Sequence, residues 1–515
     1  MSTRLLPALF GALLILRLPS LVQPMGPDQG LYAYVGERIL HGELAYRDAW
    51  DQKPPGIHYV YAGLRKIWPH DSAIAAADLV AAAAVAGLLW ALGARLGGAA
   101  AGGVAAILFL LLSDPSFARY GGVRVRAQCE TFIALFITAA ILLATTSAIG
   151  IRRTLLLFAA GASLGAAFVL KYNAALYGLP ILATVAVAGG LRLRDVLAVA
   201  AGAIALPLLL VVRFAAGDAF GDLYQATFVY NIRYSGETYG GGWEMVRYLI
   251  AFPIQHARVD GLWFVGGLGC LVLLVAGVRR RAAWLPVLWV AAACLSIAVN
   301  GSRGLPQYFV QAAPALALAA GLGAAVSFPR LPRALGWVVV VLIAVALWRV
   351  NDFPKLTSNI WHDVSYVTGS IDYRTHLARY GGQREIDKYS ALDNLDLGAM
   401  LAARTGSDET VFVFGFSPGA YVYAGRRSAS RFFWSRPVIM GFNAEDPRCG
   451  VAGLLTDLQR SRPVVVVLQL HDWSPDVSDS APFFLGQPAL ATWLHANYHE
   501  VPAIDGFNAW VLNGR

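Results

Sequence analysis

Residues 26–55 read GPDQGLYAYVGERILHGELAYRDAWDQKPP and directly follow the first long apolar stretch of the chain. This segment gathers acids, bases and aromatic residues in a chain that otherwise consists mostly of Ala, Leu, Val and Gly. Charged groups are costly beside a bilayer and are seldom kept there without a task. The segment therefore indicates a membrane-embedded fold with a functional loop at the membrane surface.

The composition is that of a polytopic membrane protein. Hydrophobic residues make up 57% and charged residues 14% of the 515 residues, whereas soluble domains carry about 25% charged residues. The mean hydropathy is +0.55 and the net charge is +9. The four cysteines show neither metal-ligand spacing nor a paired pattern; they are Cys129, Cys270, Cys294 and Cys449. We therefore expect no disulfide framework and no redox chemistry.

About eleven apolar stretches approach the length that a transmembrane helix needs, roughly 20 residues. They lie near residues 5–22, 73–94, 98–113, 130–148, 154–170, 174–190, 196–213, 260–278, 283–299, 306–327 and 334–350. The first is expected to remain uncleaved, because Arg17 interrupts it and no small-residue cleavage site follows.

Basic residues in the short loops orient these spans. With the N-terminus inside, every inside loop carries arginine, as short cytoplasmic loops usually do. These arginines are Arg95, Arg152, Arg153, Arg192, Arg194, Arg279, Arg280, Arg281, Arg330 and Arg333. The longer polar segments then share the extracytoplasmic face; they are 24–72, 114–129, 214–259, 300–305 and everything after residue 350.

Two of these outer segments carry structural expectations. Residues 26–70 are expected to form short helices at the interface, and the aromatic anchors would be Trp50, Tyr59, Tyr61 and Trp68. Residues 214–259 are rich in Tyr, Gly and Arg and are interpreted as a loop.

The composition changes near residue 351, which divides the chain into a transmembrane domain (1–350) and an extracytoplasmic domain (351–515). In the second part, helices are predicted at 384–404 and 488–498. Strands are predicted at 409–416, 463–470 and 507–512. The continuous apolar run of the middle strand is typical of burial on both faces. This alternation predicts a small α/β domain.

Asp28 is the main candidate for acid–base chemistry, because it lies just past the first span. A carboxylate there can serve as a general base, or it can be a solvated loop acid or a helix N-cap. The alternatives in the same segment are Glu37, Asp48 and Asp51. Gln29 and Tyr32 are candidate substrate-binding residues beside it.

Several cations on the same face could bind a phosphate. Lys53 precedes a rigid Pro-Pro pair, and its other interpretation is a side chain reaching to lipid headgroups. The remaining candidate cations are Arg119, Arg124, Arg126, Lys171 and Arg303. Glu130 begins a span beside the arginine-rich loop as a candidate catalytic acid, and Tyr308 follows Arg303 as a substrate-binding candidate.

An acid after the first span, followed by Lys-Pro-Pro, resembles the first outer loop of GT-C type polyprenyl-phosphate-sugar glycosyltransferases. That class includes the protein O-mannosyltransferases and the aminoarabinose transferases that act on lipid A. Residues 414–434, FGFSPGAYVYAGRRSASRFFW, also resemble the tail domain of bacterial members. The resemblance implies that Asp28 is the base and that Lys53 and Lys171 contact the donor phosphate. Many related loops carry a second acid where this chain has Gln29.

The resulting prediction is a multi-pass glycosyltransferase of the bacterial inner membrane. It would move a sugar from a polyprenyl-phosphate donor to a lipid, glycan or protein acceptor on the outer face, with no role for nucleic acid. No cofactor is assigned. A divalent metal stays open, although His41, His58 and His256 are scattered. The alternatives are a transporter or flippase of lipid-linked glycans, and a non-catalytic scaffold of the cell envelope.

Overall fold

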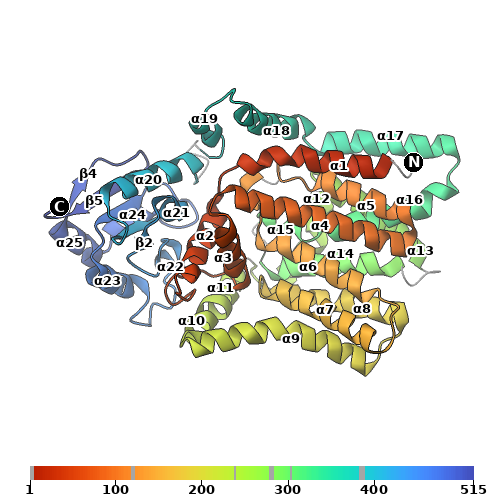
Figure 1. Ribbon diagram of the computed structural model, residues 1–515, viewed down its shortest axis with the longest axis horizontal. Helices are drawn as coiled ribbons and strands as arrows, with labels where there is room; N and C mark the ends of the chain where they lie inside the picture. The colour runs from red at the N-terminus through yellow and green to blue at the C-terminus, as the bar shows by residue number, and fades with distance from the viewer. Residues whose placement is uncertain (1–4, 118–121, 237–238, 278–282, 302–303, 382–388) are drawn as a thin grey trace.

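The computed structural model describes residues 5–117, 122–236, 239–277, 283–301, 304–381 and 389–515. A bundle of long helices occupies one end of the molecule, and a smaller tail with a β-sheet occupies the other (Figure 1). Helices α2 (Pro27–Leu40) and α3 (Gly56–Ile67) lie between the two parts. The segment that opened the sequence analysis therefore sits at the junction.

Each of the eleven expected spans contains a helix. In chain order these are α1 (Leu5–Arg17), α4 (Ser72–Gly97), α5 (Ala99–Leu112), α6 (Cys129–Ala144), α7 (Gly150–Phe168), α8 (Gly178–Gly189), α9 (Leu193–Ala216), α13 (Gly261–Gly277), α14 (Trp284–Val299), α16 (Ala313–Ser327) and α17 (Arg333–Val350). Among the described residues, 6 helices are long and apolar enough to cross a membrane, or up to 8 if each bent pair is one span. A multi-pass membrane fold is thus confirmed, while the number of crossings stays a prediction.

Small residues let the helices of the bundle approach closely. A Cβ atom on Gly161 of α7 would lie only 2.0 Å from the carbonyl oxygen of Val199 in α9. On the facing helix, a Cβ atom on Gly202 would lie 2.0 Å from the carbonyl oxygen of Phe158. Apolar side chains gain little from pairing with one another in lipid, so close backbone packing through Gly and Ala holds such bundles together.

The first outer loop is helical, as expected, but its aromatic residues do not all lie at the interface. Pro27 starts α2, which turns by 72° from the preceding helical segment. Trp50 and Tyr61 are only 1% and 0% exposed, while Trp68 is 45% exposed. The prediction of membrane anchors is therefore wrong for Trp50 and Tyr61, because the tail and neighbouring helices cover them.

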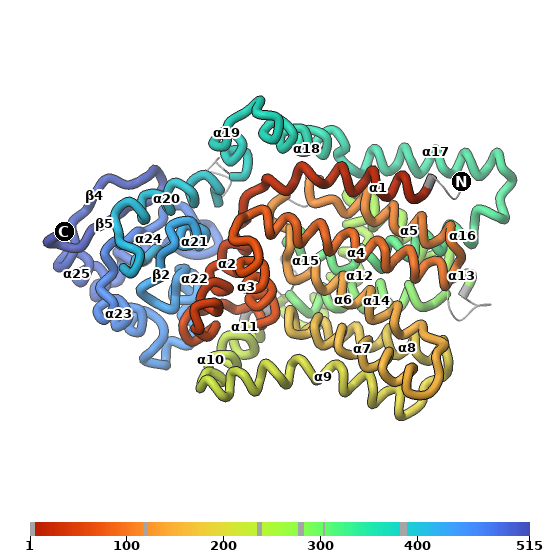
Figure 2. The backbone as a smooth tube through the Cα atoms, viewed as in Figure 1, coloured from red at the N-terminus to blue at the C-terminus, as the bar shows by residue number. Residues whose placement is uncertain are grey.

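Residues 214–259 form helices instead of the irregular loop that their composition suggested. They contain α10 (Phe220–Tyr224), a π-helical turn η5 (Gln225–Val229), α11 (Tyr230–Gly236) and α12 (Gly242–Ala257). Helix α9 leads directly into this group beside the tail (Figure 2). Tyr230 of this group packs in the protein: its ring lies 5.2 Å from that of Trp50.

The tail begins with α18 (Phe353–Val367) and α19 (Tyr373–Ala378), which lead from α17 to the sheet (Figure 2). The five-stranded sheet has the order β2-β1-β3-β5-β4. Strands β1 (Thr410–Phe414), β3 (Val465–Gln469) and β5 (Phe507–Leu512) match the predicted strands, and β3 is buried throughout. Strands β2 (Arg427–Ser428) and β4 (Tyr498–Val501) form the edges.

The sheet is mixed, and helices complete the α/β tail. Strand β1 is parallel to β2 and β3, whereas β5 is antiparallel to β3 and β4. The helices of the tail are α20 (Ala391–Arg404), α21 (Gly419–Ala424), α22 (Arg436–Ile439), α23 (Gly450–Ser461), α24 (Ser480–Leu485) and α25 (Pro488–Asn497). The helix predicted at 384–404 thus begins at Ala391; residues 382–388 lie outside the described residues.

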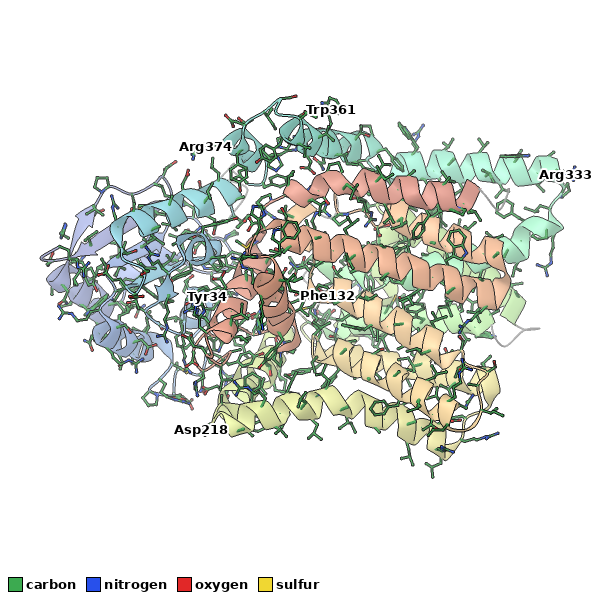
Figure 3. The ribbon with its side chains drawn as sticks, viewed as in Figure 1. Tyr34, Phe132, Asp218, Arg333, Trp361 and Arg374 are labelled. Carbon is green, nitrogen blue, oxygen red and sulfur yellow. The ribbon has the colours of Figure 1, made fainter. Side chains whose placement is uncertain are left out.

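The tail and the first outer loop share hydrogen bonds. The Trp50 N–H donates to the carbonyl oxygen of Arg431 (2.8 Å), and the Trp434 indole donates to the carbonyl oxygen of Trp50 (3.1 Å). The Tyr34 hydroxyl, on the part of α2 drawn next to the tail in Figure 3, accepts from the Ser428 N–H (2.8 Å). One hydrophobic core runs through both parts. The tail is therefore built onto the loop that carries Asp28.

Candidate active site

Asp28 lies in the first turn of α2, where the free N–H groups of a helix favour a negative charge. Burial raises the pKa of this carboxyl above its ordinary value. The positive charge of Lys53 acts against the rise, the charges of Asp51 and Glu130 add to it, and that of Lys171 again opposes it. Two predicted cations and one predicted acid thus act electrostatically on Asp28, although they come from three other segments of the chain.

Asp28 differs from the three alternative acids in its partners. Glu37 pairs with Arg65 (2.7 Å), Asp48 with Arg47 (2.8 Å), and Asp51 with His58 (2.9 Å). Within the described part of the chain, Asp28 has no hydrogen-bond or ion-pair partner. A carboxylate with no such partner can accept a proton from a bound molecule, whereas a paired one first has to release its partner.

Lys53 and Lys171 line one pocket of about 580 Å³, whose lining also includes the ends of helices. The Tyr308 ring is part of the same wall, and the Lys171 ammonium lies 4.1 Å from its centre. Other lining residues come from the start of η4 (Tyr172–Tyr177), from the 227–232 helical stretch and from the end of α14. Lys53, Lys171 and Tyr308, which were singled out separately in the sequence, thus line the same pocket.

Lys171 and Glu130 form a buried ion pair. The Nζ–Oε1 distance is 2.5 Å, and the side chains are 7% and 1% exposed. Helix α6 begins at Cys129, so Glu130 sits in its first turn, and Lys171 follows the end of α7. Because Glu130 is held by Lys171, its position favours a role in orienting that ammonium over a role in proton transfer.

The lining of the pocket combines cations and amide side chains with apolar residues. The Tyr172 and Phe228 rings stack with their centres 4.3 Å apart, and both residues line the pocket. Its apolar lining further includes Ala175, Leu176, Ile232 and Val299. A pocket lined by cations and by apolar side chains suits a molecule with an anionic head and a hydrocarbon chain.

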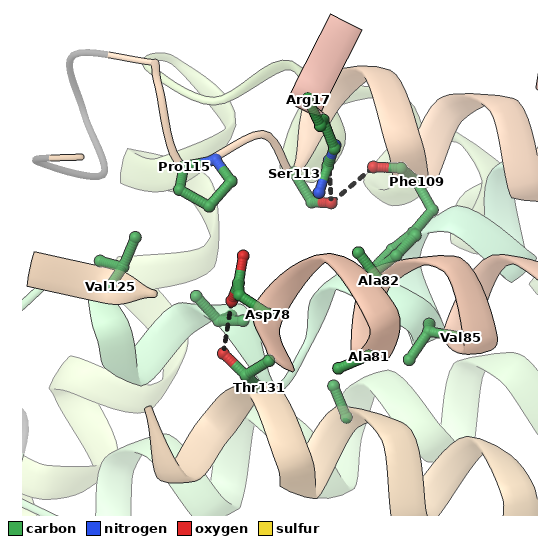
Figure 4. A pocket seen from close by; sticks show the side chains of 12 residues that line it. Arg17, Asp78, Ala81, Ala82, Val85, Phe109, Ser113, Pro115, Val125 and Thr131 are labelled. Carbon is green, nitrogen blue, oxygen red and sulfur yellow. Dashed lines mark hydrogen bonds between the residues drawn. The ribbon is translucent and has the colours of Figure 1, made fainter. Parts of the chain in front are cut away.

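The arginine-rich loop contributes differently from the prediction. Arg126 is buried away from the pocket lining: its guanidinium donates to Gln23 Oε1 (2.5 Å) and to Ser116 Oγ (3.2 Å), and it pairs with Asp78 (3.4 Å). Asp78 also accepts a hydrogen bond from Thr131 beside a cavity of about 30 Å³ (Figure 4). Arg126 therefore links residues from three other segments of the chain and is not placed to bind phosphate.

The other predicted arginines give no support for the phosphate site. Arg124 is exposed and does not belong to the lining of the pocket. Arg119 and Arg303 lie outside the described residues.

Gln29 and Tyr32 have structural partners. The Gln29 amide donates to the carbonyl oxygens of Val123 (2.5 Å) and Arg126 (2.7 Å), which ties α2 to the arginine-rich loop. The Tyr32 hydroxyl donates to Gln128 Oε1 (3.2 Å), and its ring packs on that of Tyr61 (5.3 Å). Neither residue lines the large pocket, so a substrate-binding role for them stays a prediction.

The histidines are held by other groups. His41 Nδ1 contacts the Glu37 carbonyl oxygen (2.7 Å), and His256 stacks on Phe309 (3.8 Å). Within the residues that the structure describes, no group of three His, Cys, Asp or Glu side chains could hold a metal ion.

Comparison with known proteins agrees with this architecture. Residues 52–213 match the family model described as dolichyl-phosphate-mannose-protein mannosyltransferase. No match was found among curated proteins. The crystal structure of ArnT from Cupriavidus metallidurans bound to undecaprenyl phosphate is similar, with a TM-score of 0.61 at 15% identity over 99% of this chain and 98% of that chain.

A second similar structure is the Archaeoglobus fulgidus oligosaccharyltransferase tethered to an acceptor peptide. The TM-score is 0.51 at 11% identity, over 99% of this chain and 74% of that chain. The likeness to both structures confirms the predicted GT-C fold. Together with the family match, it supports the predicted class, a membrane glycosyltransferase that uses a polyprenyl-phosphate-linked donor.

Proposed function

We propose that this protein transfers a sugar from a polyprenyl-phosphate donor to an acceptor hydroxyl or amine at the outer face of the bacterial inner membrane. The observation that carries the proposal is the electrostatic link of Asp28, a carboxylate with no described hydrogen-bond or ion-pair partner, to Lys53 and Lys171; these two cations line the large pocket, and Asp28 is not itself among the lining residues. A base beside a phosphate site is the arrangement that sugar transfer requires.

The donor phosphate would lie between Lys53 and Lys171, with its hydrocarbon chain along Leu176, Ile232 and Val299. A similar protein, ArnT, was crystallised with undecaprenyl phosphate, which supports a ligand of this class. Each charge-assisted contact to the phosphate contributes about 1.5–3 kcal/mol. The ion pair with Glu130 keeps the Lys171 ammonium in place while the pocket is empty.

Asp28, Lys53 and Lys171 each have a role in the chemical step. The Asp28 carboxylate accepts the proton of the acceptor hydroxyl or amine as that atom attacks the anomeric carbon of the sugar. The bond from this carbon to the phosphate oxygen breaks, and the electron pair leaves with the phosphate. Lys53 and Lys171 stabilise the charge that grows on the leaving group.

A second pocket is suited to the acceptor. It has a volume of about 280 Å³ and lies between the 225–233 helical stretch and residues 440–443 of the tail. Its lining combines the Tyr230 and Phe442 rings with the polar side chains of Gln225, Arg233 and Asn443. Aromatic side chains with a few convergent polar groups are typical of ligand-binding pockets.

The proposal is tested with purified protein and a polyprenyl-phosphate sugar. A transferase releases free polyprenyl phosphate in step with sugar appearing on an acceptor fraction, whereas a flippase moves the intact donor across a vesicle membrane. Intact donor after prolonged incubation with every acceptor fraction would contradict the proposal. The flippase alternative is the weaker one, because the candidate residues gather at the outer ends of the helices.

A further inference from the structure

Residues 51–53 are held by side chains at every position. The Gln52 N–H donates to Asp51 Oδ1 (2.7 Å). The Gln52 carbonyl oxygen accepts from Asn231 Nδ2 (2.7 Å), and the Lys53 carbonyl oxygen accepts from the Tyr46 hydroxyl (2.7 Å). The backbone of Gln52 and Lys53 is thus held by the side chains of Asp51, Asn231 and Tyr46.

Asn231 joins this loop to the opposite wall of the pocket. Its amide nitrogen also donates to the carbonyl oxygen of Thr227 (2.7 Å), at the π-helical turn η5. Asn231 is separated from Gln52 by 179 residues, and both line the large pocket. The Asn231 amide therefore donates to two backbone carbonyl oxygens. One of these oxygens belongs to the peptide bond that precedes Lys53.

Tyr46 is held in an unfavourable backbone conformation. Its φ angle is 70°, in the left-handed region, and its side chain is 0% exposed. The ring packs against those of His58 (5.9 Å) and Phe214 (5.6 Å). Strain of this kind costs about 1–3 kcal/mol and persists where the surroundings over-determine it, often at functional sites.

A buried contact between His58 and Asp51 also holds the loop that carries Lys53. His58 Nε2 and Asp51 Oδ2 are 2.9 Å apart, and the two side chains are 0% and 1% exposed. Because Asp51 receives both this contact and the Gln52 N–H, its carboxylate fixes the start of the loop. Pro54 and Pro55 restrict the backbone on the other side of Lys53.

We propose that Asn231 and Tyr46, with the Asp51–His58 pair, are positioning residues that hold the Lys53 backbone so that its ammonium faces the phosphate. A lysine side chain has four flexible carbon–carbon links, so much of its binding strength depends on where its backbone starts. Holding that backbone before the ligand arrives lowers the ordering cost of binding. The inference rests on the proposed phosphate role of Lys53.

The test measures binding of undecaprenyl phosphate to the purified full-length protein in detergent. We expect Asn231→Leu and Tyr46→Phe each to raise the Kd about tenfold. Asn497→Leu is the matched control for the first, because Asn497 Nδ2 donates to the Trp493 carbonyl oxygen (2.7 Å) four residues earlier, in the tail. Tyr498→Phe is the control for the second, since its hydroxyl donates to the Pro463 carbonyl oxygen (2.9 Å). Both controls should leave the Kd unchanged.

A double-mutant cycle separates positioning from general damage to the fold. In a Lys53→Ala background, Asn231→Leu should add less than twofold to the Kd. A tenfold effect that persists without Lys53, or none in either background, overturns the inference. If Lys53→Ala itself binds like the wild type, the phosphate role of Lys53 fails instead, so the two failures are distinguishable. Tyr46→Phe keeps the ring and serves if Asn231→Leu does not fold.

Discussion

The backbone of Gly30 in α2 lies against that of Gly419 in α21: a Cβ atom on Gly30 would be 2.9 Å from the Gly419 nitrogen. Gly30 is two residues from Asp28, and Gly419 belongs to the tail. A contact between backbones leaves no flexible side chain that could move aside. The tail therefore sets the position of the helix that carries the proposed base.

Replacement of Gly30 by Ala should lower sugar transfer at least tenfold, because the added methyl group pushes α2 away from α21. The matched control is Gly63→Ala in α3, where a Cβ atom would meet nothing within 4 Å. That change should leave transfer intact and stabilise the helix by up to about 1 kcal/mol. Initial rates and thermal unfolding in detergent measure both variants. Equal rates for the two would show that the contact does not position α2.

Asp28→Asn should abolish transfer while undecaprenyl phosphate still binds. The amide keeps the shape of the carboxyl group but cannot take the acceptor proton. Turnover is measured with a polyprenyl-phosphate sugar, and binding is measured separately on the same preparation. A well-folded Asp28→Asn protein that turns over like the wild type would remove the base role.

The rate of transfer should fall as the pH is lowered through the pKa of Asp28. Burial raises this pKa above the ordinary value, so the protonated, inactive form persists to a higher pH than for an exposed aspartate, that is, above about pH 4. Glu130→Gln removes a negative charge that contributes to the rise. The acid limb of the pH–rate profile should then move to lower pH. Glu409→Gln, in the tail, should leave it in place.

Lys171→Met should destabilise the protein by about 3–5 kcal/mol, because Glu130 then carries a buried charge with no partner. The double variant Lys171→Met, Glu130→Gln should recover most of that stability. Both variants should bind undecaprenyl phosphate at least tenfold more weakly than the wild type. Thermal unfolding and undecaprenyl phosphate titrations give the two quantities. A double variant that binds normally would mean that Lys171 only neutralises Glu130.

The first outer loop and the tail should lie on the same side of the membrane. After replacement of the four native cysteines, single cysteines are introduced at the exposed positions Lys66 and Ser407, and at Arg194 for the opposite side. An impermeant thiol reagent added to intact cells should label the first two and leave the third unlabelled. Labelling of only one of Lys66→Cys and Ser407→Cys would contradict the contacts between α2 and the tail.

Patterns that are local in sequence were predictable. The run PVVVVLQL became β3, because a continuous apolar run suits a strand that is buried on both faces. Lys53 was singled out because it precedes a Pro-Pro pair in a charged loop, and Lys171 because it lies at the end of an apolar span; both line the large pocket. The same reasoning misplaced Arg126, whose partners Asp78 and Gln23 lie far away in the sequence.

The parts that sequence reasoning missed depend on tertiary contacts. Trp50 was taken for a membrane anchor, yet its backbone pairs with Arg431 and Trp434 of the tail, more than 300 residues later. Asn231 was not singled out, because nothing in the neighbouring sequence indicates that the fold brings it to Gln52. The Tyr residues of 214–259 were noticed, but the place of Tyr230 in the lining of the second pocket could not be read from their spacing.

The hydrogen bonds that join α2 to the tail also bear on how the protein is made. A ribosome that has finished α17 has already synthesised Asp28, Lys53 and Lys171. The tail residues that contact α2, Gly419 and Ser428, have yet to emerge. The nascent chain can therefore insert its helices without holding an assembled catalytic centre. A chain that ends before Gly419 would therefore keep its apolar helices but lack the tail contacts that hold α2.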